Sequence, residues 1–179
     1  MSPIALKKIV IPLDAIGGKG GEFELGTIAP RVEIEENRVV LNNVSAWVRI
    51  DAARGQYLTR VTVSADGDWV CDRCGASFER GLSGAIETLF SPDVVNGDDE
   101  ARSIPAGTHE LDLTQDALDA VLLGVPIQIL CREECVGLCA HCGADLNAGP
   151  CSCAVPPDPR WDALKAIRFE QKGSPKESS

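Results

Sequence analysis

Eight cysteines, grouped in four closely spaced pairs, constrain the fold of this 179-residue chain more than any other feature. Two residues separate the members of two pairs, three separate those of another, and one separates those of the last. Such spacing suits a tetrahedral Zn²⁺ ion, because the short turn between the cysteines lets both thiolates reach one metal. The candidate ligands are Cys71 and Cys74, Cys131 and Cys135, Cys139 and Cys142, and Cys151 and Cys153.

Eight thiols complete two sites of four ligands each, so the sequence predicts about two zinc ions per chain. We expect the first two pairs along the chain to share one ion and the last two pairs to form a local second site. The spacing also permits a ribbon in which Cys71 and Cys74 join Cys139 and Cys142. A glycine follows the second cysteine of each Cys-x-x-Cys pair, where a positive φ is often needed.

The cysteines do not replace a missing core, since a chain of 179 residues can bury one without covalent help. A composition of 44% hydrophobic and 25% charged residues is typical of a globular chain. The N-terminus lacks the apolar segment of a secretory signal, and no apolar run is long enough to span a membrane. We therefore expect a soluble, cytoplasmic protein, in which reduced thiols favour metal binding over disulfides.

Three other interpretations of the cysteines are weaker. Single thiols are often small buried hydrophobic groups, but this does not explain four clustered pairs. A redox-active Cys71–Cys74 pair would have to open a helix after a parallel strand, whereas a hairpin turn is expected just before it. A catalytic zinc needs three ligands and a water, and thiolates are too abundant here for that. We expect both histidines, Glu133 and Glu134 to be solvated, and no Ser/His/Asp or phosphate-loop arrangement stands out.

The net charge of −10 is concentrated in the middle of the chain. Residues 1–80 carry ten Lys/Arg and eleven Asp/Glu, residues 81–158 carry two and thirteen, and residues 159–179 carry five and three. The middle segment, at net −11, should repel RNA, because affinity for nucleic acid depends mainly on cations that neutralise phosphates. A basic protein partner suits this segment better, and direct RNA contact would fall to the N-terminal half or the tail.

The hydrophobic pattern predicts mainly antiparallel β structure. A Gly-rich link is expected at residues 17–21, a hairpin turn at Asp66-Gly67-Asp68, and an exposed acidic loop at residues 91–106. The first cysteine pair then follows a strand end directly. Strands are predicted at residues 5–12, 39–50, 56–65 and 78–90.

A helix is predicted from Thr114, as N-cap, to about Gly124, with Ala117, Leu118, Val121 and Leu122 on one face. A second short helix is predicted at residues 159–169. The fold class is thus α+β: a mainly antiparallel β domain with one or two short helices and a C-terminal zinc knuckle. The expected domains are residues 1–130, the cysteine-rich module 131–171, and a disordered tail 172–179.

Several motifs resemble the YceD-like family, in the form with an additional C-terminal cysteine cluster. The resemblance covers roughly residues 5–168, and its most specific parts are Gly137-Leu-Cys-Ala-His-Cys-Gly143 and Asp158-Pro-Arg160. Leu123-Gly-Val-Pro126 before the second cysteine pair, Cys71-Asp-Arg-Cys74-Gly and Glu110-Leu-Asp-Leu113 also fit.

This resemblance implies a non-enzymatic role in large ribosomal subunit biogenesis, supporting accumulation or processing of its rRNA. A ribosomal protein or assembly factor is the first expected partner, because ribosomal proteins are basic and the middle of this chain is acidic. One alternative is a direct RNA-binding factor. The other is a zinc-dependent hydrolase or nuclease that trims precursor RNA.

Overall fold

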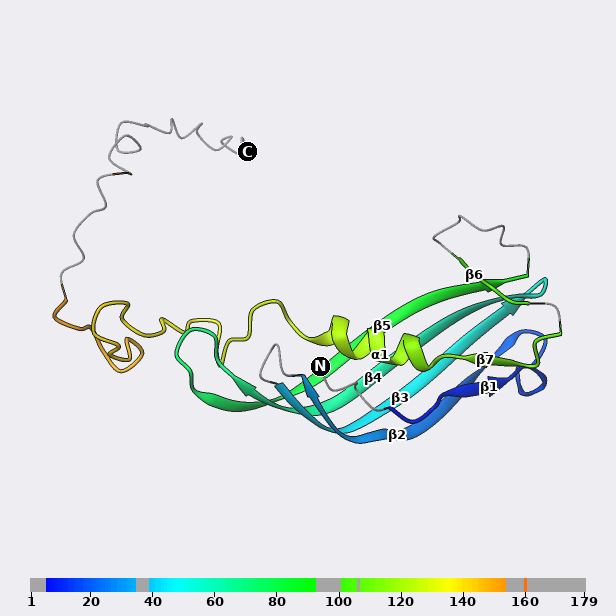
Figure 1. Cartoon of the computed structure of the whole chain (residues 1–179), viewed down its shortest axis with the longest axis horizontal. Coiled ribbons are helices and arrows are strands. Elements are labelled where there is room, and N and C mark those ends of the chain that lie inside the picture. Colours follow the sequence, from blue (N-terminus) through cyan, green and yellow to red (C-terminus); the bar gives the residue numbers. More distant parts are fainter. Residues whose placement is uncertain (1–5, 35–38, 93–100, 106, 154–159, 161–179) are drawn as a thin grey trace, which may run out of the picture. The chain divides into compact units, whose positions relative to one another are not determined.

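The computed structural model describes residues 6–34, 39–92, 101–105, 107–153 and 160. The chain divides into two compact units, Met1–Gly137 and Leu138–Ser179, whereas the boundary expected from the sequence follows residue 130. The first unit contains a five-stranded sheet, in the order β2-β3-β4-β5-β6, and a pair formed by β1 and β7 (Figure 1). Its elements are β1 (Val10–Pro12), the 3-10 turn η1 (Leu13–Ala15), β2 (Gly20–Ile34), β3 (Val39–Ala53), β4 (Gln56–Val70), β5 (Ser77–Ser91), β6 (Ala101–Ser103), β7 (Glu110–Asp112) and α1 (Thr114–Gly124).

Four strands of 15 residues, β2 to β5, form an antiparallel meander that confirms the predicted fold class. Alternate residues of β4 are buried along most of its length, since successive side chains point to opposite faces of a sheet. In β3 this alternation shifts by one residue at a bulge between Asn42 and Ser45, where Asn43 has a φ of 54°. Arg54 and Gly55, both at positive φ, make the tight turn from β3 to β4.

The predicted hairpin at Asp66-Gly67-Asp68 is wrong, because these residues continue β4 to Val70. Asp66 and Asp68 pair with β3, and their carboxylates accept hydrogen bonds from Asn43 and Asn42. Gly67 is required because the Trp69 side chain packs against it, not because it forms a turn. A Cβ atom there would lie 2.2 Å from Nε1 of Trp69, whose indole donates a hydrogen bond to the Arg80 carbonyl. Strand β2 was not predicted, and it begins at Gly20, inside the predicted Gly-rich link at residues 17–21.

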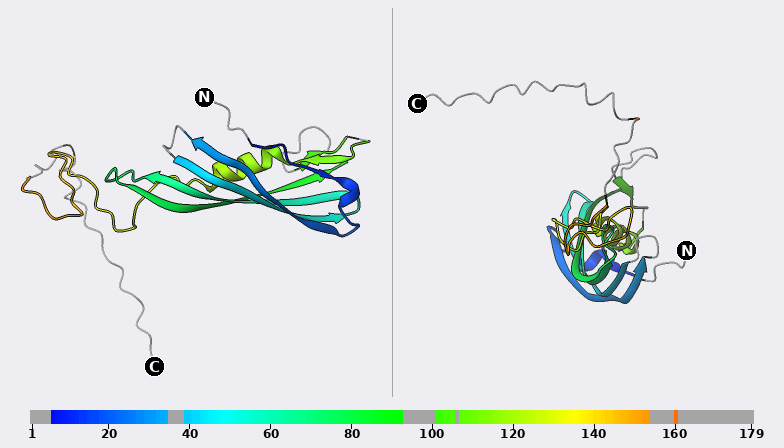
Figure 2. Two further views of the ribbon diagram at one scale, coloured as in Figure 1. Left: turned by 90° about the horizontal axis from the view of Figure 1, so that it is seen from below. Right: turned by 90° about the vertical axis from the view of Figure 1, so that its left-hand side faces the viewer.

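Helix α1 lies against the concave side of the curved sheet, packed on β4 and β5 (Figure 2). The backbones approach closely at Gly84, where a Cβ atom would be 2.0 Å from the Ala120 carbonyl oxygen. The N-cap is Leu113, so Thr114 is the first helical residue rather than the N-cap; its N–H donates to Asp112 Oδ1 and its hydroxyl accepts from the Ile9 N–H. The buried side is formed by Asp116, Ala117, Ala120 and Val121, so the expectation that Leu122 packs inward is wrong.

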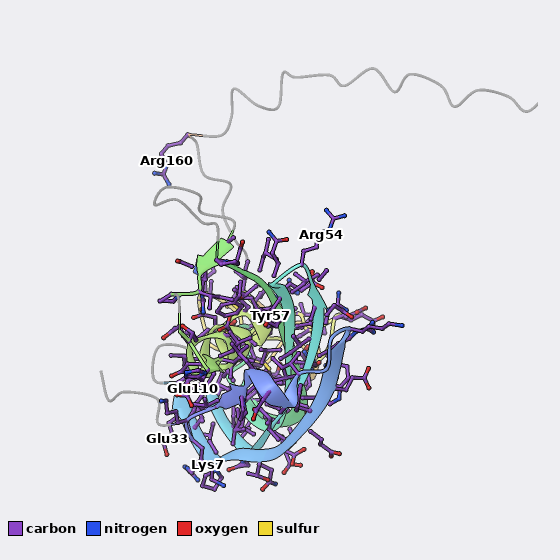
Figure 3. The ribbon with its side chains drawn as sticks, turned by 90° about the vertical axis from the view of Figure 1, so that its right-hand side faces the viewer. Lys7, Glu33, Arg54, Tyr57, Glu110 and Arg160 are labelled. Carbon is purple, nitrogen blue, oxygen red and sulfur yellow. The ribbon has the colours of Figure 1, made fainter. Side chains whose placement is uncertain are left out.

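Part of the predicted acidic loop is ordered, because Ala101–Ser103 forms β6 and pairs in parallel with the end of β5. The acidic residues 93–100, the predicted helix at residues 159–169, apart from Arg160, and the tail at 172–179 lie outside the described residues. Seen along the strands, charged side chains such as Lys7 and Glu33 project from the outside of the curled sheet (Figure 3). Within the described ranges, no helix is both long and apolar enough for a membrane span.

Candidate metal centre

The first cysteine pair lies in a tight turn between β4 and β5. Cys71 directly follows Val70, the last residue of β4, as the sequence predicted. The N–H of Cys71 bonds to the Ala76 carbonyl at 2.9 Å, and the N–H of Gly75 bonds back to the Cys71 carbonyl at 2.9 Å. Gly75 adopts a φ of 72°, which a residue with a side chain rarely adopts. The turn thereby points two thiols the same way.

The segment after α1 brings the second pair of cysteines to this turn. Asp72, between Cys71 and Cys74, anchors it twice: its N–H donates to the Ile129 carbonyl, and its Oδ2 accepts from the Ile129 N–H at 2.7 Å. Arg73 Nη1 donates to the Cys135 carbonyl at 2.7 Å. Neither positioning residue was predicted from the sequence, because both contacts join segments more than 50 residues apart in the chain.

Two further contacts fix the same segment. Arg80 on β5 donates from Nη2 to the Leu130 carbonyl at 2.7 Å, while its guanidinium lies 5.1 Å from the centre of the Phe78 ring. Gly137, at a φ of 84°, passes so close to Arg73 that a Cβ atom would lie 2.9 Å from the Arg73 carbonyl oxygen. The four sulfurs of the first group are thus held in part by contacts of Asp72, Arg73 and Arg80, which are not ligands themselves.

The sulfur distances of this first group fit a tetrahedral metal. Cys71 Sγ lies 3.8 Å from Cys135 Sγ, and Cys74 Sγ lies 3.8 Å from Cys131 Sγ. A zinc ion bound by four thiolates with bonds of about 2.3 Å places its sulfurs about 3.8 Å apart. A disulfide would require about 2 Å, and all eight cysteines are free thiols. The group can hold a metal ion.

Backbone hydrogen bonds give this first group a thiolate before any metal binds. Burial raises the pKa of Cys71, but backbone N–H groups of Cys131, Cys74 and Arg73 outweigh it and lower the pKa to about 6. Burial and the neighbouring thiols raise the pKa of Cys131 to about 12. The Ala76 N–H lowers the pKa of Cys74, yet burial and adjacent thiols raise it overall. One ionised sulfur beside neutral thiols is a starting point for cation binding.

The second unit repeats the same turn chemistry around Cys139 and Cys142. Cys139 N–H bonds to the Ala144 carbonyl at 2.8 Å, Gly143 N–H bonds to the Cys139 carbonyl at 2.9 Å, and Gly143 has a φ of 72°. Backbone N–H groups of Cys142 and His141 lower the pKa of Cys139 to about 6. The neighbouring Cys142 thiol, followed by burial, raises the pKa of Cys153 to about 11.

The structure brings the cysteines together in the two groups that the sequence favoured, and not as the alternative ribbon. In each group the four sulfurs all lie within 4.8 Å of one another. Both histidines are exposed, as are Glu133 and Glu134, and none of them joins a candidate metal group among the described residues. The groups are Cys71, Cys74, Cys131 and Cys135, and Cys139, Cys142, Cys151 and Cys153.

Comparison with known proteins gives the family. The profile of the family described as "Large ribosomal RNA subunit accumulation protein YceD" matches residues 59–168, which include all eight cysteines. The chain belongs to the YceD family. The match begins within β4, so it covers the cysteine turn, β5, α1 and both cysteine groups. The resemblance inferred from the cysteine motifs is therefore confirmed.

Curated relatives with similar sequences come from mycobacteria and plants. An uncharacterized protein of Mycobacterium tuberculosis (strain ATCC 25618 / H37Rv) is 31% identical over 122 residues, covering 65% of this chain and 58% of the relative. The "Large ribosomal RNA subunit accumulation protein YCED homolog 1, chloroplastic" of Arabidopsis thaliana is 26% identical over 112 residues, covering 46% of this YceD-family chain and 35% of the relative. The chain thus spans less than two thirds of the length of these relatives. No solved structure matches it.

Proposed function

We propose that this protein is a non-enzymatic zinc-binding factor in biogenesis of the large ribosomal subunit, acting in the cytosol through a basic protein partner. The family name, which refers to accumulation of large-subunit ribosomal RNA, supports the pathway. The observation that carries the proposal is the pair of four-sulfur groups, in each of which all ligand atoms lie within 4.8 Å of one another.

Zinc suits both groups because of the chemistry of the donors. Four thiolates are soft ligands, and tetrahedral sites of four sulfurs are typical of zinc or of iron–sulfur centres. The sulfur separations of 3.8 Å in the first group correspond to a single ion. Zinc has no redox chemistry of its own, so its role here would be to join the β4–β5 turn to the segment that follows α1.

A structural role for the metal supports the non-enzymatic proposal. A catalytic zinc keeps one coordination position open for water, whereas four cysteine ligands complete the tetrahedron. Each group supplies four sulfurs from the chain itself. Glu133 and Glu134 lie in the turn between Cys131 and Cys135, and both are exposed to solvent. We therefore interpret them as surface groups that contribute to solubility.

The arrangement of arginines favours a protein partner over RNA. Arg31 pairs with Glu33, Arg49 with Asp51, and Arg60 with Glu87, all on exposed strand positions. Phosphate binding requires cations that are free to neutralise the nucleic acid backbone, and these guanidinium groups already have carboxylate partners. The N-terminal half, which with the tail was expected to make any direct RNA contact, therefore offers little free positive charge along these strands.

The test is depletion of the protein in its own organism, followed by measurement of large- and small-subunit rRNA and of ribosomal particles on sucrose gradients. We expect large-subunit rRNA to fall relative to small-subunit rRNA, and the wild-type chain to restore it. Normal large subunits after complete depletion would overturn the proposed function.

Purified protein separates the remaining alternatives. Metal analysis should give about two zinc ions per chain, since each tetrahedral site takes four protein ligands. Incubation of the zinc-loaded protein with precursor rRNA should leave the RNA intact, whereas specific cleavage would establish the nuclease alternative. Binding to rRNA that weakens steeply with salt would instead favour the RNA-binding alternative.

A further inference from the structure

The outer side of the long sheet carries an ordered pattern of exposed residues. We call it the open face: the outward-pointing side chains of β2 to β5, on the side opposite α1. Cross-strand pairing arranges these side chains in rows that run across the sheet. One row contains Ser45 and Ser64, whose hydroxyls lie 2.9 Å apart, and the next contains Trp47 and Thr62. Small hydroxyl side chains thus stand beside the large Trp47 along the middle of this face.

The open face contains an acidic hollow of about 500 Å³. Asp68 on β4 and Glu79 on β5 are directly opposite each other, although like charges in such a pair destabilise a sheet. Neither has a cation within ion-pair distance among the described residues, and Asp66 and Asp68 accept hydrogen bonds only from side-chain amides of β3. The hollow is lined by Asn42, Asn43, Asp66, Gly67, Asp68, Glu79, Arg80 and Gly81.

Arg80 lines this hollow without neutralising it. Its guanidinium donates to the Leu130 carbonyl and lies over the Phe78 ring, on the side that holds the cysteine segment. The arginines that point to the open face, Arg31, Arg49 and Arg60, each contact a carboxylate within 4 Å. Uncompensated negative charge on this face thus lies at Asp66, Asp68 and Glu79 around the hollow, and also at the exposed Glu22 and Glu24 of β2.

A second, smaller hollow of about 210 Å³ lies farther along the same strands. Its residues are mostly small, so a polypeptide backbone could approach the sheet closely there. Trp47, half-buried in this hollow, offers an aromatic surface beside the small residues. The lining comprises Glu24, Gly26, Ser45, Ala46, Trp47, Thr62 and Ser64.

We propose that the open face binds an extended, lysine- or arginine-rich segment of a protein, with a cationic side chain in the acidic hollow and the backbone crossing toward Trp47. This rests on the proposed function, to which it adds the surface that recognises the partner. Charge complementarity selects this occupant: RNA would meet three carboxylates without a free cation, and a second copy of the chain would bring the same acidic hollow against itself. The Asp68–Glu79 pair, unfavourable in the free protein, becomes favourable around a bound cation.

The test uses the full-length, zinc-loaded protein and a synthetic peptide of alternating lysine and threonine. A length of about 12 residues is suitable, because an extended chain of that length spans roughly 40 Å. The variant Asp68→Asn/Glu79→Gln removes two charges from the open face. The variant Asp14→Asn/Glu110→Gln removes two exposed charges from other parts of the first unit and serves as the matched control.

We expect the open-face variant to weaken peptide binding about fivefold to tenfold, since each exposed ion pair contributes up to about 1 kcal/mol. The control variant should bind like the wild type, and Trp47→Phe should remove the change in tryptophan fluorescence on binding. Equal weakening in both double variants, no saturable binding, or binding of an rRNA fragment at this face instead would overturn the proposal.

A rescue experiment separates this proposal from the function on which it rests. If depletion lowers large-subunit rRNA and the open-face variant restores it fully, the docking surface is wrong while the proposed function stands. If depletion leaves large subunits normal, the proposed function fails, whatever the peptide binds.

Discussion

The sulfur atoms of Cys74 and Cys131 lie 3.8 Å apart, although the two residues are 57 positions apart in the chain. This contact closes a loop that includes β5, β6, β7 and α1. The second cysteine group, by contrast, closes only the short segment from Cys139 to Cys153. Metal binding to the two groups should therefore have unequal effects on the stability of the β domain.

Cys71→Ser should destabilise the β domain, and Cys139→Ser should not. Loss of a ligand from the first group releases the segment after α1 from the β4–β5 turn, at a cost of about 3 kcal/mol or more, because structural zinc binding contributes directly to folding. Thermal unfolding followed by circular dichroism measures the difference, and metal analysis should give about one zinc for each variant. Equal destabilisation by the two substitutions would contradict this partition of the cysteines.

Zinc loading at pH 7 should release fewer than four protons per ion at the first site. Zinc binds thiolates, so each thiol that is protonated beforehand must lose its proton. Cys71, with a pKa of about 6, is already mostly ionised at pH 7, whereas Cys131, with a pKa of about 12, is protonated. Titration of the metal-free Cys139→Ser variant with zinc in a weakly buffered indicator solution counts the protons. Release of four would show that the Cys71 pKa is not lowered.

Much of the candidate metal centre could be predicted from sequence, because ligand spacing is a local property. Cys-x-x-Cys followed by glycine indicates the turn directly, and both Gly75 and Gly143 adopt the positive φ expected after such pairs. The contacts of Asp72 and Arg73 could not be predicted in the same way. They depend on where the segment after α1 lies in space, which no local pattern specifies.

The β strands, likewise, could be predicted only in part from the sequence. Strands near residues 39–50, 56–65 and 78–90 were identified from hydrophobic residues, and the structure extends them into three of the four long strands. Asp66-Gly67-Asp68 was misassigned because its composition is typical of turns, while tertiary contacts of Trp69 and the asparagines of β3 keep it in the strand. β2 was missed because its N-terminal part, around Glu22 and Glu24, is largely exposed.

Gly84→Ala should destabilise the protein by about 2 kcal/mol or more, because overpacking forces the backbone apart. The added Cβ atom would lie 2.0 Å from the Ala120 carbonyl oxygen, so α1 would have to move away from β5. Gly81→Ala, on the same strand, is the matched control, since its Cβ atom would meet nothing closer than 3.8 Å. Chemical denaturation should show a change within about 0.5 kcal/mol for the control. Equal effects would mean that α1 does not pack closely at Gly84.

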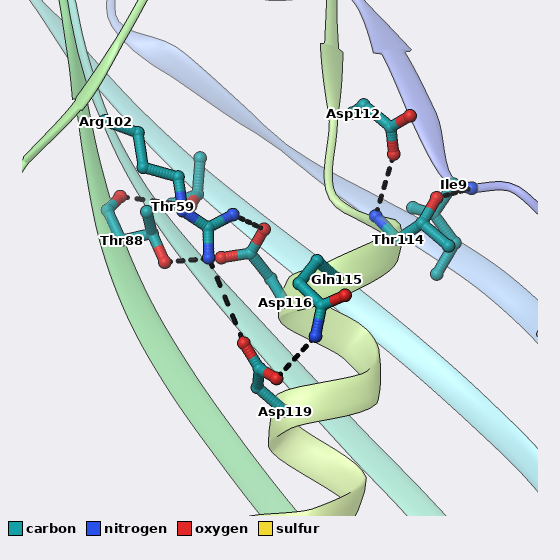
Figure 4. A network of polar contacts seen from close by, with 9 residues as sticks. All are labelled: Ile9, Thr59, Thr88, Arg102, Asp112, Thr114, Gln115, Asp116 and Asp119. Atoms are coloured by element: carbon teal, nitrogen blue, oxygen red, sulfur yellow. Dashed lines mark hydrogen bonds and ion pairs between the residues drawn. The ribbon is translucent and has the colours of Figure 1, made fainter. Parts of the chain in front are cut away.

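The buried carboxylate of Asp116 holds strand β6 to α1 (Figure 4). Its side chain is fully buried, and it accepts hydrogen bonds from the Thr88 hydroxyl and from Arg102 Nη1, the latter at 2.7 Å. Arg102 also approaches Asp119 at 3.9 Å, and Thr59 donates to the Thr88 carbonyl at 3.1 Å. Short β6 therefore depends on one polar network, since it pairs with β5 over only three residues.

Arg102→Ala should lower the free energy of unfolding by about 3 kcal/mol, because it leaves a buried carboxylate without its cation. Asp119→Asn is the control: that carboxylate is 30% exposed and 3.9 Å from the guanidinium, so its removal should cost less than about 1 kcal/mol. Asp116→Asn/Arg102→Ala should recover part of the loss, since an amide is less costly to bury than an unpaired charge. Denaturant unfolding of the three variants measures these differences. If the double variant is no more stable than Arg102→Ala, the unpaired charge is not the cause, and Arg102 acts mainly by packing against Phe90, whose ring centre lies 5.9 Å away.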